Sequence, residues 1–373
     1  MKNYLFSIVA VFIVVSIVAC KRDDDEPERV RKSISRLYIS TEDYASGSAA
    51  ADLYNVWALD SVDGEKLPKT FSFKIASGAK GGNMIHFSPF SGGSLFHGSL
   101  NSKSNLDTAV HVLEVSKTGV ISNGTSIRNR IYDKVRGLYY TVVNDDKFSE
   151  DFLLFANASD TTKGTPATET AVPDYTLFAI DRPRNKGNFT RPRYRMKLDH
   201  NPWGVIAIKN DLVISNATEK DGGVVVYKNF IPQLLNKGDT LMKAPEKYVL
   251  KVADAQNIRG LSYSASADIL LLTDYVQDQA NSGKILVFEK FSQYQSSQTI
   301  TPTRIVTGAL TLLQEPIDVA IDTKEDGKYF FVADPVARRV FRFLISDTGN
   351  VAPNDEITIE NNRRPRSISL DSR

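Results

Sequence analysis

The sequence predicts an all-β protein, a six-bladed β-propeller, and three observations carry that prediction. A degenerate repeat recurs along the chain, made of a turn, a short strand, a second turn, a strand ending in Asp or Asn, a loop and a further strand. Each copy is rich in β-branched and aromatic residues, which favour strands. One copy is divided between the two ends of the chain, as a closed ring of blades requires.

The clearest copy of the repeat lies near the C-terminus, where its three strands are expected at 315–322, 328–334 and 339–343. Equivalent triplets of strands are expected at 257–263, 269–274 and 284–288; at 201–207, 212–216 and 223–227; at 135–139, 152–157 and 175–180; and, more weakly, at 83–87, 94–97 and 110–115. A fourth, outer strand is expected at 70–75, 194–198, 247–252, 304–306 and 356–360.

The sixth copy is split between the termini. Its later strands are expected at 36–40 and 55–59, and its first strand at 364–370. Pairing of the two ends would complete this blade, close the ring and hide strand edges that otherwise invite aggregation. The copies differ in length, so a seven-bladed ring remains the main alternative, with a β-sandwich or a two-domain fold behind it.

The last copy resembles NHL-type and YncE-like propeller repeats. The resemblance covers the chain from about residue 34 to the C-terminus, so 34–373 is expected to form a single propeller domain. It implies the architecture and says little about activity, because one fold serves many functions.

The first 20 residues have the features of a secretory signal peptide. Lys2 is the only charge before Cys20, and the apolar stretch that follows is shorter than the ~20 residues of a membrane span. The sequence Ile17-Val18-Ala19-Cys20 resembles the lipobox of bacterial lipoproteins, which implies a lipid on Cys20 and anchoring in a membrane. The alternative is an uncleaved membrane helix with a structural cysteine.

A charged stretch follows the cysteine. Residues 21–33 include Lys21, Arg22 and three consecutive aspartates, and such a segment cannot bury apolar surface, so we expect a solvated tether. Lysine followed by acidic residues resembles the surface-export signal of Bacteroidota lipoproteins. That resemblance implies an outer-membrane location with the domain facing the cell exterior.

Composition excludes some classes of function. The formal net charge is only +2 and the basic residues form no single run, which argues against nucleic acid as a partner. The sequence contains none of the hydrolase-elbow, zinc-protease or phosphate-loop motifs that we sought. No cofactor is expected. Gluconolactonase-like six-bladed propellers hold calcium, but no acidic cluster marks such a site here.

The repeat also aligns the candidate binding residues, because the loop before the first strand and the loop after the second open on the same face of a propeller. The positions before or at the start of the first strand carry Arg136, Trp203, Arg259 and Arg366, with Asp318 at the corresponding place in its own blade. The second strands end in His97, Asn157, Asn216, Asp274 and Asp334. Gly137, Gly204 and Gly260 follow three of the first set and let another group approach the backbone.

Arginine presents a planar fork of donors that suits a carboxylate or sulfate, and tryptophan offers a flat face to a sugar ring. The sequence therefore favours a non-catalytic binding protein for a glycan or peptide at the mouth of the channel. One alternative is a lyase or hydrolase that acts on an acidic sugar. Another is a scaffold for an outer-membrane protein complex. At the level of the residues, the arginines could instead pair with Asp274 and Asp334 and serve only structure.

Overall fold

The computed structural model describes residues 33–43, 53–101, 106–144, 149–159, 174–236 and 238–373. The chain separates into two compact units, Met1–Ser33 and Ile34–Arg373, and all of the described strands belong to the second. The predicted signal peptide, the lipid site at Cys20 and the tether up to residue 32 lie outside the described residues.

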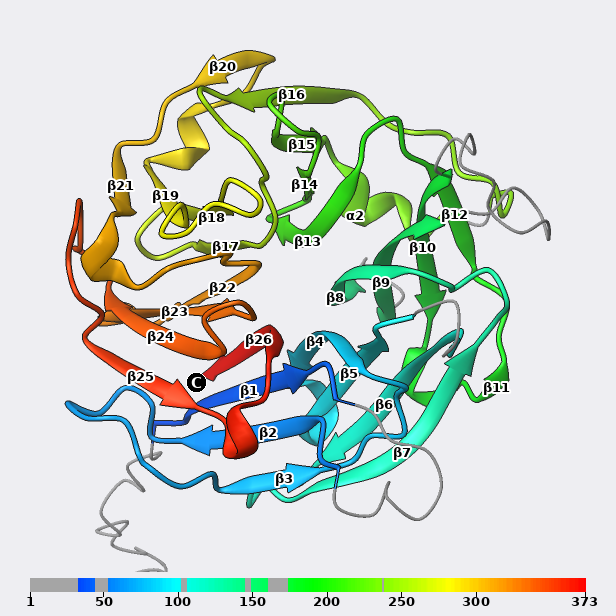
Figure 1. Ribbon diagram of the computed structural model, residues 1–373. Coiled ribbons are helices and arrows are strands. Elements are labelled where there is room, and N and C mark those ends of the chain that lie inside the picture. Colours follow the sequence, from blue (N-terminus) through cyan, green and yellow to red (C-terminus); the bar gives the residue numbers. More distant parts are fainter. Residues whose placement is uncertain (1–32, 44–52, 102–105, 145–148, 160–173, 237) are drawn as a thin grey trace, which may run out of the picture. The chain divides into compact units, whose positions relative to one another are not determined.

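Six antiparallel blades form a closed ring, which confirms the predicted fold (Figure 1). The innermost strand of each blade contacts the innermost strand of the next, all the way round. In ring order these strands are β26 (Pro365–Ser372), β4 (Gly82–Ser88), β8 (Val135–Asn144), β13 (Pro202–Ile208), β17 (Leu261–Ser264) and β22 (Asp318–Ile321). They surround a central channel.

The remaining strands extend each blade outward. In blades 1 and 2 they are β1 (Ser35–Thr41), β2 (Val56–Asp60), β3 (Phe73–Ile75), β5 (Ser94–Ser99), β6 (Ala109–Val115) and β7 (Ile121–Arg128). In blades 3 and 4 they are β9 (Ser149–Ser159), β10 (Asp174–Asp181), β12 (Tyr194–Lys197), β14 (Asp211–Asn216), β15 (Gly223–Tyr227) and β16 (Lys247–Val252). In blades 5 and 6 they are β18 (Ile269–Asp274), β19 (Lys284–Glu289), β21 (Arg304–Thr307), β23 (Tyr329–Asp334), β24 (Arg339–Leu344) and β25 (Asp355–Thr358).

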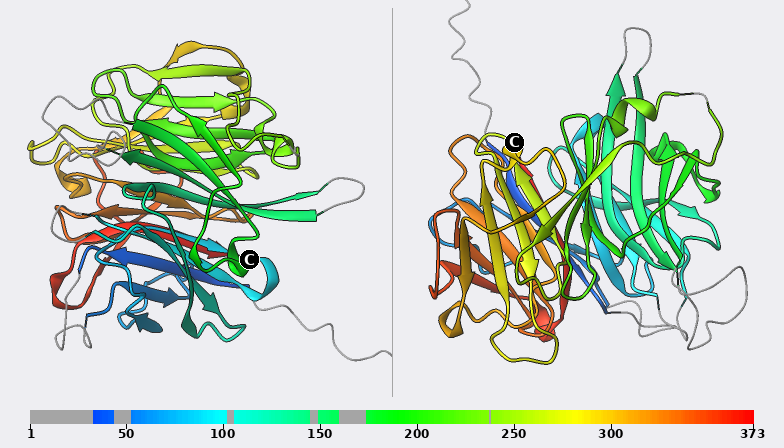
Figure 2. Two further views of the ribbon diagram at one scale, coloured as in Figure 1. Left: turned by 90° about the vertical axis from the view of Figure 1, so that its right-hand side faces the viewer. Right: turned by 90° about the horizontal axis from the view of Figure 1, so that it is seen from above.

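Short helical turns lie in the connections. They are η2 (Phe90–Gly92), η3 (Pro183–Asn185), α2 (Phe230–Gln233), η4 (Phe291–Gln293), η5 (Ala309–Thr311) and η6 (Glu360–Asn362). The hairpin of β8 and β9 is the longest in the described chain, and its cyan-green ribbon extends beyond the other strands in Figure 2.

The C-terminal strand closes the ring, as the split repeat predicts. β26 pairs antiparallel with β1, with Leu37 opposite Leu370 and Ile39 opposite Ile368. Beyond the strands, Arg373 N–H donates to the carbonyl of Ile34 at 3.0 Å. Both ends of the second unit are therefore held in the same blade.

The hydrophobic core lies between blades rather than within them. Each of six buried clusters combines residues of two neighbouring blades, and the cluster between blades 6 and 1 contains Trp57, Phe331 and Ile368. Alternate residues of each strand face opposite neighbours, so nearly continuous apolar strands such as Ile269–Asp274 are buried on both sides. Packing of one blade therefore depends on the next.

The outer strands differ from expectation at three places. The outer strand of blade 2, β7, was not predicted. The first blade's outer strand, expected at 70–75, pairs only over Phe73–Ile75. Two short parallel strands were not predicted: β11 (Asn188–Phe189) pairs with β7, and β20 (Gln298–Ile300) pairs with β16. Each comes from the following blade and covers the outer edge of the preceding one.

Candidate functional site

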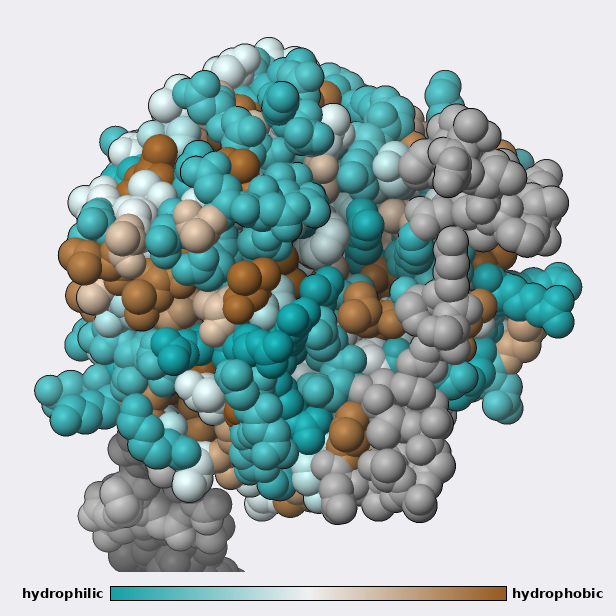
Figure 3. Space-filling view, viewed as in Figure 1, coloured by the Kyte–Doolittle hydropathy of each residue, from teal (hydrophilic) through white to brown (hydrophobic). Residues whose placement is uncertain are grey.

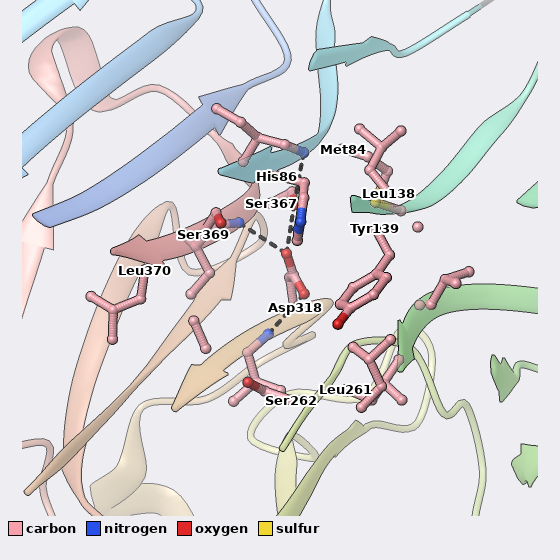
Figure 4. Close-up of a pocket in the computed structure, with 18 of the residues that line it drawn as sticks. Met84, His86, Leu138, Tyr139, Leu261, Ser262, Asp318, Ser367, Ser369 and Leu370 are labelled. Carbon is pink, nitrogen blue, oxygen red and sulfur yellow. Dashed lines mark hydrogen bonds between the residues drawn. The ribbon is translucent and has the colours of Figure 1, made fainter. Parts of the chain in front are cut away.

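The six inner strands enclose a cavity of about 310 Å³ along the ring axis. Its walls combine apolar side chains with polar ones, among them His86, Tyr139, Ser262, Asp318 and Ser367 (Figure 4). The ring centroids of His86 and Tyr139 are 5.4 Å apart. Burial lowers the pKa of His86 to about 4, so this imidazole is neutral at physiological pH.

Glycines set the width of the channel near one end. A Cβ on Gly260 would lie 2.5 Å from the Cα of Asp318, and one on Gly137 would lie 2.6 Å from the carbonyl oxygen of Trp203. Gly204 is crowded by the side chain of Leu261. The group that approaches each glycine is therefore the neighbouring inner strand.

At this end of the channel the structure brings Arg136, Trp203 and Arg259 together from three blades. The guanidinium carbons of both arginines lie 4.7 Å from the centroid of the Trp203 ring. Arg366 is close enough that its charge acts on Arg136 and that the charge of Arg259 acts on it. The four residues that share a place in the repeat thus form one cluster, which we call the arginine cluster.

The arginine cluster has little negative charge to balance it. Among the described residues, no carboxylate lies within 4.0 Å of Arg136 or Arg259, and the nearest to Arg366 is Glu42 at 3.9 Å. The alternative prediction, that these arginines pair with Asp274 or Asp334, is therefore wrong for the described chain. Arg136 instead donates to Asn201 Oδ1 at 2.8 Å, and Arg259 donates to the carbonyl of Ile258 at 3.2 Å.

Two donors of the cluster are left over. The Nε–H groups of Arg259 and Arg366 are buried and have no hydrogen-bond acceptor among the described residues. Burial, reinforced by the charge of Arg259, lowers the pKa of Arg136 to about 10, and burial likewise lowers the pKa of Arg366. Both shifts arise chiefly because burial disfavours the charged form of the guanidinium group.

The ring of Trp203 contacts two of the arginines. A sugar ring needs an open indole face, but the indole here is already stacked with two guanidinium groups. Trp203 also lines the channel. It therefore packs with both arginines at the channel end.

Asp318 lies inside the ring, on the seam between blades 6 and 1. Its Oδ2 accepts hydrogen bonds from the Ser367 hydroxyl at 2.6 Å and from the Ile368 N–H at 2.9 Å, and its Oδ1 accepts from the Val319 N–H at 3.0 Å. Burial raises the pKa of this carboxyl to about 6 despite these bonds. Asp318 can therefore carry a proton at mildly acidic pH.

Three of the predicted residues at strand ends are used by the backbone. Asp334 is fully buried and accepts from the N–H groups of Gln314, Val336 and Ala337. One oxygen of Asp274 accepts from Asn257 N–H at 2.6 Å. Asn216 Oδ1 accepts from Thr218, both from its N–H and from its hydroxyl. These contacts fix turns, as strand-end Asp and Asn often do.

His97 and Asn157 do not reach the mouth of the channel. His97 is fully buried, with its Nε2 2.7 Å from Ser40 Oγ and its Nδ1 2.6 Å from Ser77 Oγ. Asn157 is buried and bonded to Asp133 Oδ1 and to the Lys134 N–H. Because their polar atoms are already paired out of reach of solvent, we remove both residues from the candidate site.

Two neighbours of the arginine cluster were not predicted from the sequence. Asn201 anchors Arg136, and the ring of Tyr275 lies 5.6 Å from the guanidinium carbon of Arg259. Both stand beside repeat landmarks, since Asn201 precedes the first strand and Tyr275 follows Asp274 at the end of the second. That position in the repeat was the available signal.

No group of three or more His, Cys, Asp or Glu side chains suited to a metal ion occurs among the described residues. The same part of the chain contains no helix that is both long and apolar enough to span a membrane. On the face of the ring viewed in Figure 3, hydrophilic side chains predominate and the apolar ones are scattered.

Solved structures with the same architecture exist at low sequence identity. The chain is similar to a putative 6-phosphogluconolactonase from Bacteroides uniformis, with 10% identity and a TM-score of 0.53 over 91% of this chain and 99% of the other. It is also similar to the periplasmic gluconolactonase PpgL of Pseudomonas aeruginosa, with 12% identity, a TM-score of 0.53 and the same coverage. At such identity the likeness concerns the fold alone.

No protein-family model and no curated protein matches the chain. The resemblance of its repeats to the NHL and YncE types therefore stays a prediction, while the six-bladed propeller is shown by the strand topology.

Proposed function

We propose that this chain is a lipid-anchored surface protein of the outer membrane that binds a small anionic ligand at its arginine cluster. The ligand is a carboxylate or a sulfate, carried by an acidic saccharide or by a peptide terminus or acidic side chain. The protein acts as a binding module without catalysis.

The observation that carries the proposal is the pair of buried, unpartnered Nε–H groups on Arg259 and Arg366. A buried donor without an acceptor costs free energy, and the cost is greater for a charged group. With Arg136 and Trp203 beside them, an oxyanion would supply the missing acceptors and place a negative charge next to three guanidinium groups. Charge-assisted hydrogen bonds of this kind stabilise by about 1.5–3 kcal/mol each.

The test is a glycan and peptide array probed with the full chain, followed by calorimetry on variants with the ligands that bind. Arg259→Ala should weaken binding roughly ten- to hundredfold, since each ~1.4 kcal/mol is tenfold. Arg259→Lys should recover only part of the affinity, because lysine keeps the charge and loses the fork. Arg339→Ala, at a half-exposed arginine of blade 6, is the matched control and should leave binding unchanged.

Trp203 separates anion binding from sugar stacking. If the indole only positions the guanidinium groups, Trp203→Phe should retain most of the affinity for an acidic glycan, whereas Trp203→Ala should weaken that affinity. A neutral glycan that binds as tightly as its acidic counterpart would contradict the proposal. So would arginine variants that lower the melting temperature but leave affinity intact.

The anchor is tested separately. Cys20→Ala should remove incorporation of a radiolabelled lipid precursor and release the protein from the membrane fraction. The location on the cell exterior is tested by adding protease to intact cells, which should degrade the wild-type protein. Unchanged lipid labelling of the variant would refute Cys20 as the lipid site.

A second candidate is an enzyme that acts on an acidic sugar, and Asp318 is the observation that favours it. This carboxyl, with a pKa near 6, lines the cavity that also contains His86 and Tyr139. A group that titrates near neutrality can give and take protons. Two structurally similar propellers bear the name gluconolactonase, so aldonolactones are the first substrates to assay. Activity lost in Asp318→Asn but retained in Arg339→Ala would favour this candidate.

A further inference from the structure

Four of the six blades share a structural feature that the repeat did not predict, a parallel segment paired with the outer strand. The outer edge of each outer strand in blades 2 to 5 is covered by a parallel segment of the following blade, taken from its connection between third and fourth strands. The four covering segments are β11, Leu241 with its neighbours, β20, and Gly349 with its neighbours. A covered edge offers no template to another chain.

The hydrogen bonds of blade 5 define which groups are covered. Thr303 N–H donates inward, to the carbonyl of Val287 in the third strand, β19. Two residues later, the carbonyl of Ile305 in β21 points outward and accepts from Gly349 N–H of the covering segment at 2.7 Å. Thr307 N–H then donates to Gly349 C=O at 3.0 Å. Blade 3 has the same spacing, with Arg193 bonded inward and Arg195 bonded outward to its covering segment.

Blade 6 has the same hydrogen bond from its fourth strand to its third strand, but no described segment of blade 1 pairs with the outer edge of its fourth strand. Asn354 N–H donates to Arg342 C=O at 2.8 Å, so Glu356 and Thr358 correspond to Ile305 and Thr307. The equivalent connection of blade 1 meets β25 through a side chain only, where Leu67 N–H donates to Asp355 Oδ2 at 2.9 Å. Among the described residues, no backbone hydrogen bond joins residues 66–74 to β25.

A groove lies where the covering segment would be. Two adjoining cavities of about 300 and 650 Å³ share Lys69, Thr70, Phe71 and Thr358 in their walls. One wall is the outer edge of β25 and the turn η6, and the other is the segment 68–74 of blade 1. In Figure 1, β25 and β3 lie at the rim of the ring in these two neighbouring blades.

We propose that this groove binds an extended peptide segment of a partner protein, which adds to blade 6 as a parallel fifth strand. One peptide residue donates its N–H to Glu356 C=O and accepts from Thr358 N–H, as Gly349 does in blade 5. Addition of a strand to a sheet edge is a general mode of peptide recognition. The repeat itself defines the occupant, since an extended strand fills this position in four other blades.

The charges of the groove agree with a peptide held through its backbone. Lys69 is paired with Asp355 at 3.2 Å and Lys74 with Glu360 at 2.7 Å, so each cation at the rim already has its anion. Half-buried Phe71 packs against Trp57, with ring centroids 5.0 Å apart, and offers an apolar wall to alternate side chains of the strand. A polyanion would find no free charge here.

The test is selection of peptides from a random dodecapeptide display library on the full chain, with affinities of the synthesised peptides measured by fluorescence anisotropy. Thr358→Pro removes the outward N–H at an edge, where proline is tolerated. It should weaken binding more than tenfold, whereas the matched control Thr358→Val keeps the N–H and should stay within twofold. Methylation of one backbone nitrogen of the peptide should likewise cost more than tenfold.

Hydrogen exchange on the unmodified chain gives a readout that does not depend on the proline variant folding. A bound peptide should slow exchange in residues 355–358 and leave β21, whose edge is covered, unchanged. Failure to select any peptide, or selected peptides that protect other strands, would overturn the proposal. Concentration-dependent dimerisation that Thr358→Pro abolishes would replace the partner peptide with a second copy of this chain. The anion proposal is unaffected by any of these results, because the arginine cluster shares no residue with the groove.

Discussion

Asp318 of blade 6 accepts a 2.6 Å hydrogen bond from the hydroxyl of Ser367 in the C-terminal strand. The bond joins the last blade to the strand that completes the first. Ser367 Oγ in turn accepts from the Ile85 N–H of blade 2 at 3.1 Å. A short chain of polar contacts therefore crosses three inner strands at the place where the ring closes.

Asp318→Asn should change how stability depends on pH. The pKa of Asp318 is raised to about 6 in the folded chain, above the ~3.9 of an unfolded aspartate. Between these values the folded chain retains a proton that the unfolded chain has lost, so the contribution of Asp318 to the free energy of unfolding falls as pH rises from about 4 to about 6. The variant lacks this titration.

Urea unfolding at pH 4.5 and pH 7 checks the Asp318 prediction. The variant should be more stable relative to wild type at pH 7 than at pH 4.5, since contributions from all other groups cancel in the difference. Profiles that stay parallel across this range would show that Asp318 does not titrate there.

Arg342→Leu should be severely destabilising. Arg342 is fully buried in β24 and donates to the carbonyl oxygens of Val62, Gly64 and Glu65, which belong to blade 1. Leucine would leave these acceptors without a partner, at about 1–3 kcal/mol for each that stays buried. The free energy of unfolding should drop by about 3 kcal/mol or more. Arg339→Leu, in the same strand but half-exposed, is the control and should cost less than about 1 kcal/mol.

Gly260→Ala should destabilise the ring through contact with backbone. The added methyl would lie 2.5 Å from the Cα of Asp318, so β17 and β22 would have to separate. Overpacking of this kind costs about 1–3 kcal/mol. Gly238→Ala has nothing within 4 Å and provides the control. Equal melting temperatures for both variants would contradict the close approach of the two strands.

Removal of residues 363–373 should abolish the cooperative thermal transition and cause aggregation. The deletion takes away β26, which pairs with β1, and exposes the edge of β1 and the side of blade 2. A synthetic peptide of residues 363–373 should restore the transition when added in excess. A shortened chain that melts like the full one would show that the ring does not need this strand.

The sequence predicted the parts of the fold that depend on local pattern. Strands such as Ile269–Asp274 begin with a run of four apolar residues because blades pack on both sides, and the split copy required that the ends pair. The repeat also aligned Arg136, Trp203, Arg259 and Arg366, which the structure brings to one end of the channel. Register within a repeat is sufficient for that inference, because equivalent positions of a ring face the same axis.

The remaining features depend on contacts between blades, which no local pattern records. Arg342 stands between two phenylalanines and has the alternation of a strand with an exposed arginine, yet it is buried by a loop of the neighbouring blade. The covering strands β11 and β20 are two and three residues long and partly polar, too short to be recognised from composition. The sequence likewise did not indicate that the guanidinium groups of Arg136 and Arg259 would lie against the ring of Trp203.

The pairing of Leu37 with Leu370 has a consequence for the order in which the molecule forms. Blades 2 to 6 are built from strands that follow one another closely in the chain and can assemble as they are made. Blade 1 forms only when β1 pairs with β26, which lies on the far side of the other five blades in sequence, so its closure costs the most entropy among the six blades described. We therefore expect folding to end, rather than begin, at the N-terminal blade, with the meeting of the two ends as the slow step.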